Sequence, residues 1–402
     1  MKTGIIGGNI VLKDRVIENG SIALSGGRIE YAGEKWVECD RMIEAHGAWI
    51  LPGFIDVHND AIEVEAEPRP GAHIPIEIAL SSLESKLVSH GITSIFHSFS
   101  CIEEKREVRS LDHITRHIEA IHGLKDHALM RHLVHARYDI TETSFAIPLE
   151  KFIREGKVDL ISFMDHTPGQ GQYRNIQVLV DYLVHHHDIP EEQAQTIVAE
   201  RMKKGDSPKL LEHIKSLIKA AEETGLPIAS HDDDSPEKVL MMKNLGIGIS
   251  EFPINLDSAK AARELGMHVV CGAPNVLRGK SNSGNMKVLD AIREGCVDVL
   301  CSDYLPPAML HTVFKLYRSG EMPLEDAVRM VSLNAAESVG LGDRLGSIEE
   351  GKAGDILVVR EGKGFPFVEQ VFVEGAHVLD RRRLDVPRVS HSGQKTVSGY
   401  GR

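Results

Sequence analysis

The middle of this 402-residue chain alternates short apolar runs with longer amphipathic segments, and this alternation limits the possible folds more than any other feature. Short apolar runs are typical of strands, and apolar residues at three- and four-residue spacing are typical of helices. Strands separated by helices indicate a parallel sheet, because parallel strands need a long crossover connection. The sequence predicts eight strands, at 51–58, 93–97, 133–138, 160–164, 227–231, 247–252, 268–272 and 299–302.

Eight strand–helix units predict an α/β fold, a (β/α)8 TIM barrel over residues 51–345. Several helical segments are followed by glycine, as at Gly225 and Gly266, and glycine is a common helix stop. An open doubly wound sheet is the alternative, but no glycine-rich nucleotide fingerprint follows the first strand. Helices are expected at 78–90, 111–121, 210–223, 236–245, 258–265 and 286–293.

Three parts of the chain do not fit the barrel repeat. Helical stretches at 175–187 and 190–204 form an insertion at about 167–207, which we interpret as a lid or a dimer contact. The segment 381–402 is basic and has little periodicity, so it is interpreted as a disordered tail or an arm across a partner subunit. Residues 1–50 and the segment around 355–373 are rich in strand signals instead.

Charge and cysteine content narrow the functional class. Lys plus Arg is 46 and Asp plus Glu is 59, so the formal net charge is −13, which argues against sequence-independent nucleic-acid binding. The five cysteines form no CxxC motif and are interpreted as reduced thiols of a cytoplasmic protein. No signal peptide and no membrane-spanning apolar run are expected.

Polar side chains end most of the predicted strands, where the catalytic residues of a barrel lie. His58 and Asp60 are expected to share one face, because alternate residues of a strand point the same way. Asp165 and His166 should point to opposite faces, so at most one of them is expected to be a direct ligand. The candidate metal ligands are His58, Asp60, Asp165, His166, His231, Glu251 and Asp303.

Imidazoles and carboxylates together indicate a divalent metal, zinc first, with manganese, iron or nickel as alternatives, and one or two ions per chain. Such an ion makes hydroxide available near neutral pH, and Asp303 is the expected general base. His97 and His135 also lie on strands, and either is interpreted as a supporting or a core residue. The run 232–234 is expected to cap the helix that starts at Pro236.

The chain resembles the amidohydrolase superfamily at residues 51–58, which read LPGFIDVH, and again at 332–336 and 346–355. This resemblance implies a small β-sandwich domain, built from residues 1–50 plus 346–402, beside the barrel. It also implies a metal-dependent hydrolase and a homo-oligomer, with a dimer expected. Asp60 stands where the superfamily commonly has a second histidine, and Glu251 stands where many members have a histidine.

A narrower resemblance is to the diphosphatases of the carbon–phosphorus lyase pathway, at residues 67–71, 164–170, 230–233, 272–275, 281–285 and 302–306. It implies removal of diphosphate from a phosphorylated sugar, a ribose 5-triphosphate that carries a phosphonate at C1. Such a substrate needs cationic and donor groups in the loops at the catalytic end. The candidate substrate-binding residues are Arg69, Arg174, Arg278, Lys280, Ser281 and Asn285.

Two other functions remain open at this point. Hydrolysis of a C–N bond, by a cyclic amidase, deacetylase or deaminase, is compatible with the same fold, because fold does not fix function. A non-enzymatic role as a subunit of a larger assembly is the other, with the inserted helices and the tail as contact surfaces.

Overall fold

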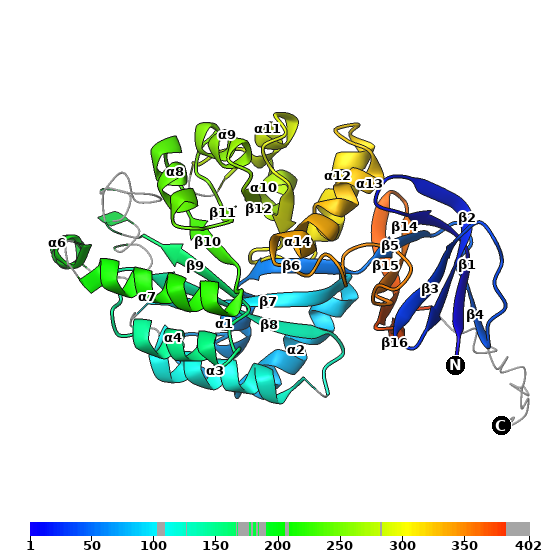
Figure 1. Cartoon of the computed structure of the whole chain (residues 1–402), viewed down its shortest axis with the longest axis horizontal. Coiled ribbons are helices and arrows are strands. Elements are labelled where there is room, and N and C mark those ends of the chain that lie inside the picture. Colours follow the sequence, from blue (N-terminus) through cyan, green and yellow to red (C-terminus); the bar gives the residue numbers. More distant parts are fainter. Residues whose placement is uncertain are drawn as a thin grey trace, which may run out of the picture.

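The computed structural model describes residues 1–102, 109–125, 127–165, 167, 177, 180–181, 184, 190–205, 209–281 and 284–382. Figure 1 shows a large unit of strands and helices beside a smaller β-rich unit that contains the N-terminus and the last strands of the chain. Within these ranges no helix is long and apolar enough to cross a membrane.

The large unit is an eight-stranded parallel barrel, as the sequence predicts. Neighbouring strands pair in chain order, and each pair is parallel. The first and last strands meet at an isolated parallel bridge between Asn59 and Asp303. The strands are β6 (Phe54–Asn59), β7 (Ile92–Cys101), β8 (Arg131–Asp139), β9 (Leu160–Met164), β10 (Ile228–His231), β11 (Ile249–Glu251), β12 (His268–Gly272) and β13 (Val299–Cys301).

Helices follow the strands and pack on the outside of the barrel (Figure 1). Gly225 and Gly266 follow two of these helices with positive φ angles of 69° and 68°, the left-handed conformation in which glycine ends a helix. The larger helices are α2 (Ile76–Ser89), α3 (Leu111–Gly123), α4 (Ala146–Arg154), α7 (Lys209–Thr224), α8 (Pro236–Asn244), α9 (Leu256–Glu264) and α12 (Ala308–Arg318). The shorter ones are α1 (Ala61–Ala66), α10 (Ala273–Arg278), α11 (Val288–Arg293), α13 (Leu324–Arg329) and α14 (Leu333–Ser338).

The interior of the barrel is an apolar plug to which all eight strands contribute, including Phe96, Leu160 and Val270. Side chains of α14, such as Ala335 and Ala336, join the same cluster. Because this plug fills the interior, polar side chains from the carboxyl ends of the strands collect at the open mouth of the barrel.

The smaller unit combines strands from both ends of the chain in one hydrogen-bonded sheet. β1 pairs with β4 through Thr3–Ile6 and with β5 through Asn9 and Ile10, so the sheet divides along this strand. Its buried side chains, among them Ile22 and Phe372, form a core separate from that of the barrel. The strands are β1 (Thr3–Val11), β2 (Val16–Ser25), β3 (Arg28–Gly33), β4 (Arg41–Glu44), β5 (Trp49–Pro52), β14 (Ile356–Gly362), β15 (Phe365–Val373) and β16 (Ala376–Asp380).

The predicted insertion after the fourth barrel strand is seen only in part. Its second helical stretch is α6 (Glu191–Gly205), which lies at the far end of the barrel from the smaller unit (Figure 1). Most of the first stretch, 175–187, lies outside the described residues, as does the tail from residue 383 onwards.

Candidate active site

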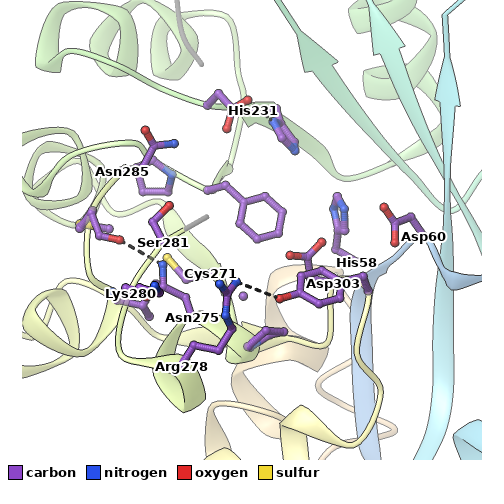
Figure 2. A pocket seen from close by; sticks show the side chains of 18 of the residues that line it. His58, Asp60, His231, Cys271, Asn275, Arg278, Lys280, Ser281, Asn285 and Asp303 are labelled. Atoms are coloured by element: carbon purple, nitrogen blue, oxygen red, sulfur yellow. Dashed lines mark hydrogen bonds and ion pairs between the residues drawn. The ribbon is translucent and has the colours of Figure 1, made fainter. Parts of the chain in front are cut away.

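A cavity of about 240 Å³ lies at the carboxyl ends of the barrel strands (Figure 2). Its wall combines side chains from the first and last strands with the segment that follows β12. His58, Asp60 and Asp303 face it from one part of the wall, and Arg278 and Lys280 face it from another. The cavity therefore places ionisable groups of both signs around one space.

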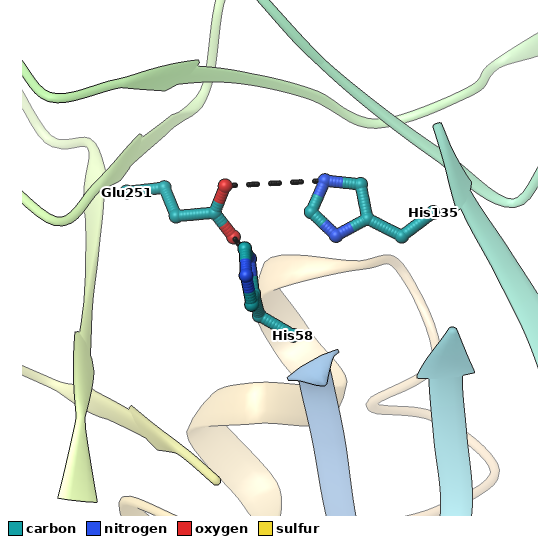
Figure 3. A group of neighbouring side chains, drawn as sticks. All are labelled: His58, His135 and Glu251. Carbon is teal, nitrogen blue, oxygen red and sulfur yellow. Dashed lines mark hydrogen bonds and ion pairs between the residues drawn. The ribbon is translucent and has the colours of Figure 1, made fainter. Parts of the chain in front are cut away.

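Three buried side chains from different strands meet beside this cavity (Figure 3). His58 ends β6, His135 lies on β8 and Glu251 ends β11, and a ligand atom of each lies within 4.8 Å of the others. His58 Nδ1 lies 2.7 Å from Glu251 Oε1. Burial holds the pKa of His58 well below its ordinary value, so this imidazole stays neutral, which is the form that binds a metal.

Hydrogen bonds fix the orientation of His135. Its Nδ1 lies 3.2 Å from the carbonyl oxygen of Val57, and a carbonyl accepts only, so Nδ1 carries the proton. The Nε2 lone pair then points toward Ser162 Oγ at 2.9 Å and Glu251 Oε2 at 3.9 Å. Holding one ring nitrogen so that the other is free to coordinate is typical of metal-binding histidines.

His231 at the end of β10 extends this cluster. Its Nε2 lies 3.8 Å from Glu251 Oε2, and neither atom has a hydrogen-bond partner among the residues that the structure describes. Buried polar groups are nearly always satisfied, so two such atoms facing each other indicate a missing ligand. Two atoms that bind one tetrahedral zinc at about 2.1 Å lie about 3.4 Å apart, close to this separation. His231 therefore lies beside the three-residue cluster, at a distance from Glu251 at which both could bind one divalent ion.

Asp303 lies at the point where the barrel closes. Its backbone N–H donates to the carbonyl oxygen of His58 at 3.0 Å, and its carbonyl oxygen accepts from the N–H of Asp60 at 3.1 Å. Burial and the neighbouring charge of Asp60 raise the pKa of Asp303 to about 6. A carboxylate with a pKa near neutrality is suited to taking and returning a proton.

Left-handed backbone marks three strand ends around the cavity. Asp232, Phe252 and Asp303 follow β10, β11 and β13 with φ angles of 54°, 53° and 57°. Each costs of order 1 kcal/mol or more in a residue other than glycine, and such strain concentrates at functional sites. All three residues line the cavity, so the strained positions coincide with the candidate active site.

The segment after β12 supplies the cationic part of the wall. Helix α10 ends at Gly279, whose φ of 71° turns the chain back over the cavity. Arg278 Nη1 lies 3.4 Å from the hydroxyl of Tyr304, at the entrance. The predicted substrate-binding residues that line the cavity are Arg278, Lys280, Ser281 and Asn285.

The remaining predicted site residues lie outside the three-residue cluster or outside the described residues. Asp60 lines the cavity but is not in the three-residue cluster, because the strand ends at Asn59 and Asp60 caps α1 with φ −105° and ψ 8°. Asp165 Oδ1 accepts from the backbone N–H of Thr167 at 2.9 Å, and Asp165 does not line the cavity. Arg69 is exposed in the loop after α1 and is also not on the cavity wall. His166 and Arg174 lie outside the described residues.

The carboxylates that follow β10 do not cap α8, so that prediction is wrong. Ser235 is the cap, and its Oγ accepts from the backbone N–H of Lys238. Asp233 instead accepts hydrogen bonds from Ser230 and Ser250, which ties the ends of β10 and β11 together.

His97 also lies away from the cavity. Its side chain contacts His132 on the outer face of the barrel, and His97 Nε2 lies 2.8 Å from His132 Nδ1.

Sequence reasoning missed Arg137, which lines the cavity from β8. It is two residues after His135, so strand alternation alone could have placed both on one face.

The fold and this cluster define the class of the protein. The model of the Amidohydrolase family matches residues 49–378, which is most of the chain, and the chain therefore belongs to the amidohydrolase family and is a hydrolase. Solved structures with this fold include a prolidase complexed with N-methylphosphonate-L-proline, with a TM-score of 0.63, 17% identity, and coverage of 95% of this chain and 100% of that one.

Relatives with known names act on different bonds. The α-D-ribose 1-methylphosphonate 5-triphosphate diphosphatase of Escherichia coli (strain K12) is 30% identical over 92% of this chain and 98% of its own length. An imidazolonepropionase of Caldanaerobacter subterraneus subsp. tengcongensis is 25% identical, over 85% of this chain and 84% of its own. An adenine deaminase of Clostridium botulinum (strain 657 / Type Ba4) is 26% identical over 90% of this chain but only 54% of its own.

Proposed function

We propose that the protein removes diphosphate from α-D-ribose 1-methylphosphonate 5-triphosphate and leaves the 5-phosphate, in phosphonate catabolism. The observation that carries this proposal is the cavity wall. It combines His58, which belongs to the cluster with His135 and Glu251 beside the cavity, with a cationic, donor-rich segment at Arg278–Asn285. Amide substrates need no such cationic wall, whereas a triphosphate needs positive charge and several donors. The E. coli diphosphatase, similar over nearly its whole length, supports the same reaction.

The donor set would hold one divalent ion through His58, His135, His231 and Glu251, and zinc suits its three imidazoles and one carboxylate. When bound, such an ion supplies Lewis acidity and lowers the pKa of a water molecule to about 7. Manganese, iron and nickel are compatible with the same donors.

The chain's own residues account for the proton and the charge. Water attacks the α-phosphorus, a P–O bond forms, and the bond from the α-phosphorus to the oxygen that bridges to the β-phosphorus breaks. Diphosphate leaves with that electron pair. Asp303 takes the proton of the attacking water, because its raised pKa lets it do so near neutral pH. Arg278 and Lys280 neutralise phosphate oxygens from the cavity wall.

Phosphorus NMR on the metal-loaded protein tests this proposal. With the sugar triphosphate as substrate, one turnover should release diphosphate and the sugar 5-phosphate together, and Asp303→Asn should lower the rate by about 10²- to 10⁴-fold. Stepwise release of single phosphates, or no release with any of the four metals, would refute it. Turnover of 4-imidazolone-5-propanoate or adenine at comparable rates would instead favour C–N hydrolysis.

A further inference from the structure

Arg137 is a cation on the cavity wall that forms no ion pair with a carboxylate of the described residues. It lies on β8, two residues after His135, and lines the cavity with His58, Asp60 and Asp303. Its Nη1 donates to Ser100 Oγ at 3.3 Å, which fixes one side of the guanidinium. Its Nε is buried without a hydrogen-bond partner among the described residues.

No carboxylate of the described chain lies within ion-pairing distance of Arg137, although several line the same cavity. The charge of Arg137 acts on Asp60 and Asp303, whose carboxyl groups line the same cavity. Arg137 is half-buried on this wall and its Nε is buried, so an anionic ligand in the cavity would gain a charge-assisted contact there.

The strand order places Arg137 opposite the cationic segment already described. β8 is the third strand around the barrel from β6, and β12 is the seventh, so the two strands face each other across the mouth. Arg137 comes from β8, whereas Arg278 and Lys280 follow β12. Among the candidate metal ligands, His135 lies on the same strand as Arg137, and Glu251 ends β11, which pairs with β12. A bound polyphosphate therefore meets positive charge on both sides of the reacting centre.

From this arrangement, and resting on the proposed function, we infer that Arg137 binds the phosphoryl group that is attacked, while the Arg278–Asn285 segment binds the rest of the polyphosphate. A guanidinium presents paired N–H groups that match two phosphate oxygens, and Nε is one of the two donors that such a contact uses. Arg137 would thereby hold the attacked group beside Asp303.

Binding of inorganic triphosphate tests the inference, because its three phosphoryl groups can reach both Arg137 and the Arg278–Asn285 segment. We would measure it by calorimetry on the full-length, metal-loaded protein and on Arg137→Gln, Arg137→Lys and Arg116→Gln. Arg116→Gln makes the same charge change on the exposed face of α3, so it is the matched control. Arg137→Gln should weaken triphosphate binding at least about tenfold, Arg137→Lys should weaken it less, and the control should bind as the wild type does.

Elemental analysis of the same samples separates a binding role from a positioning role. Metal content should be unchanged in Arg137→Gln. Loss of metal in parallel with loss of triphosphate binding would overturn the inference, because Arg137 would then act through His135. Unchanged triphosphate affinity would overturn it as well. Where Arg137→Gln does not fold, Arg137→Lys decides, since unchanged triphosphate affinity in that variant would contradict a paired contact. If the wild type never hydrolyses the sugar triphosphate, the proposed function fails, whereas the binding experiment still decides the role of Arg137.

Discussion

The substitution Glu251→Gln tests the metal site more sharply than any other. It distinguishes whether Glu251 is a metal ligand or only a structural carboxylate. Glu251 is buried, with 1% of its surface exposed, and it lies against three histidines. Only its Oε1 makes a short contact, 2.7 Å to His58 Nδ1, whereas Oε2 lies 3.9 Å from His135 and 3.8 Å from His231. The amide has the same shape and keeps an oxygen acceptor but loses the negative charge.

The two roles predict different magnitudes. A hydrogen bond to a charged group contributes about 1.5–3 kcal/mol, and the amide keeps part of it, so the metal-free protein should lose only about 1–2 kcal/mol of unfolding free energy. Metal affinity should fall by more than about 100-fold. Substituting a residue that only supports a metal ligand already lowers metal affinity by about 10- to 100-fold, and a direct ligand should matter more. Urea unfolding of the metal-free protein and competition with a chromophoric chelator measure the two quantities.

The opposite pattern would refute the reasoning. If Glu251→Gln keeps its metal affinity but the metal-free protein loses about 3–5 kcal/mol, Glu251 is a buried ion-pair partner of His58 and not a ligand. Ser258→Ala on α9 provides a control, because this buried hydroxyl lies outside the cavity and should change metal affinity little.

Three further predictions concern the same cavity. Burial raises the folded-state pKa of Asp303 from its ordinary value of 3.8 to about 6, so the metal-free protein should lose stability as pH rises through that range. Asp303→Asn should remove this dependence and raise the unfolding free energy at pH 8 by up to about 3 kcal/mol, in urea titrations; an unchanged pH dependence would contradict the assignment. Arg278→Ala and Lys280→Ala should each raise KM for the triphosphate about tenfold in steady-state assays, and unchanged KM would exclude the β12 segment from substrate binding. Chelation should abolish activity and lower the melting temperature in calorimetry, and zinc should restore both; a chelated protein that stays active would contradict a metal-dependent reaction.

The barrel could be predicted from the sequence because its pattern is regular. Each strand is a short apolar run, and helices with glycine stops such as Gly225 and Gly266 separate the strands. The same regularity explains why His58, His231 and Asp303 line one cavity, since polar residues at the ends of buried strands lie together at the mouth of a barrel.

The positions of Asp60 and Asp165 could not be predicted in full, because they depend on local backbone geometry. Asp60 lines the cavity with His58 but lies outside the three-residue cluster; the pairing of β6 shifts between Asp56 and Asn59, and the chain then turns into α1. Asp165 directly follows β9, and its carboxylate accepts a hydrogen bond from the backbone N–H of Thr167. Alternation along a strand does not predict the environment of either side chain, because both environments depend on where the extended strand ends.

Burial hides the difference between a ligand and a core residue. His135 and His97 are both fully buried strand histidines, so the sequence gives them the same weight. The two histidines differ in the side of the strand on which they lie. His135 points to Glu251, whereas His97 points to His132 outside the barrel. Arg137 was overlooked because arginine is not a metal ligand, although its spacing from His135 places it on the inner face.

Anomalous diffraction from crystals of the zinc-loaded protein tests the central claim most directly. The account predicts one strong peak at the zinc edge within about 2.0–2.2 Å of a donor atom from each of His58, His135, His231 and Glu251. A peak bound by other residues, or full occupancy elsewhere with these four side chains still in contact only with one another, would contradict it.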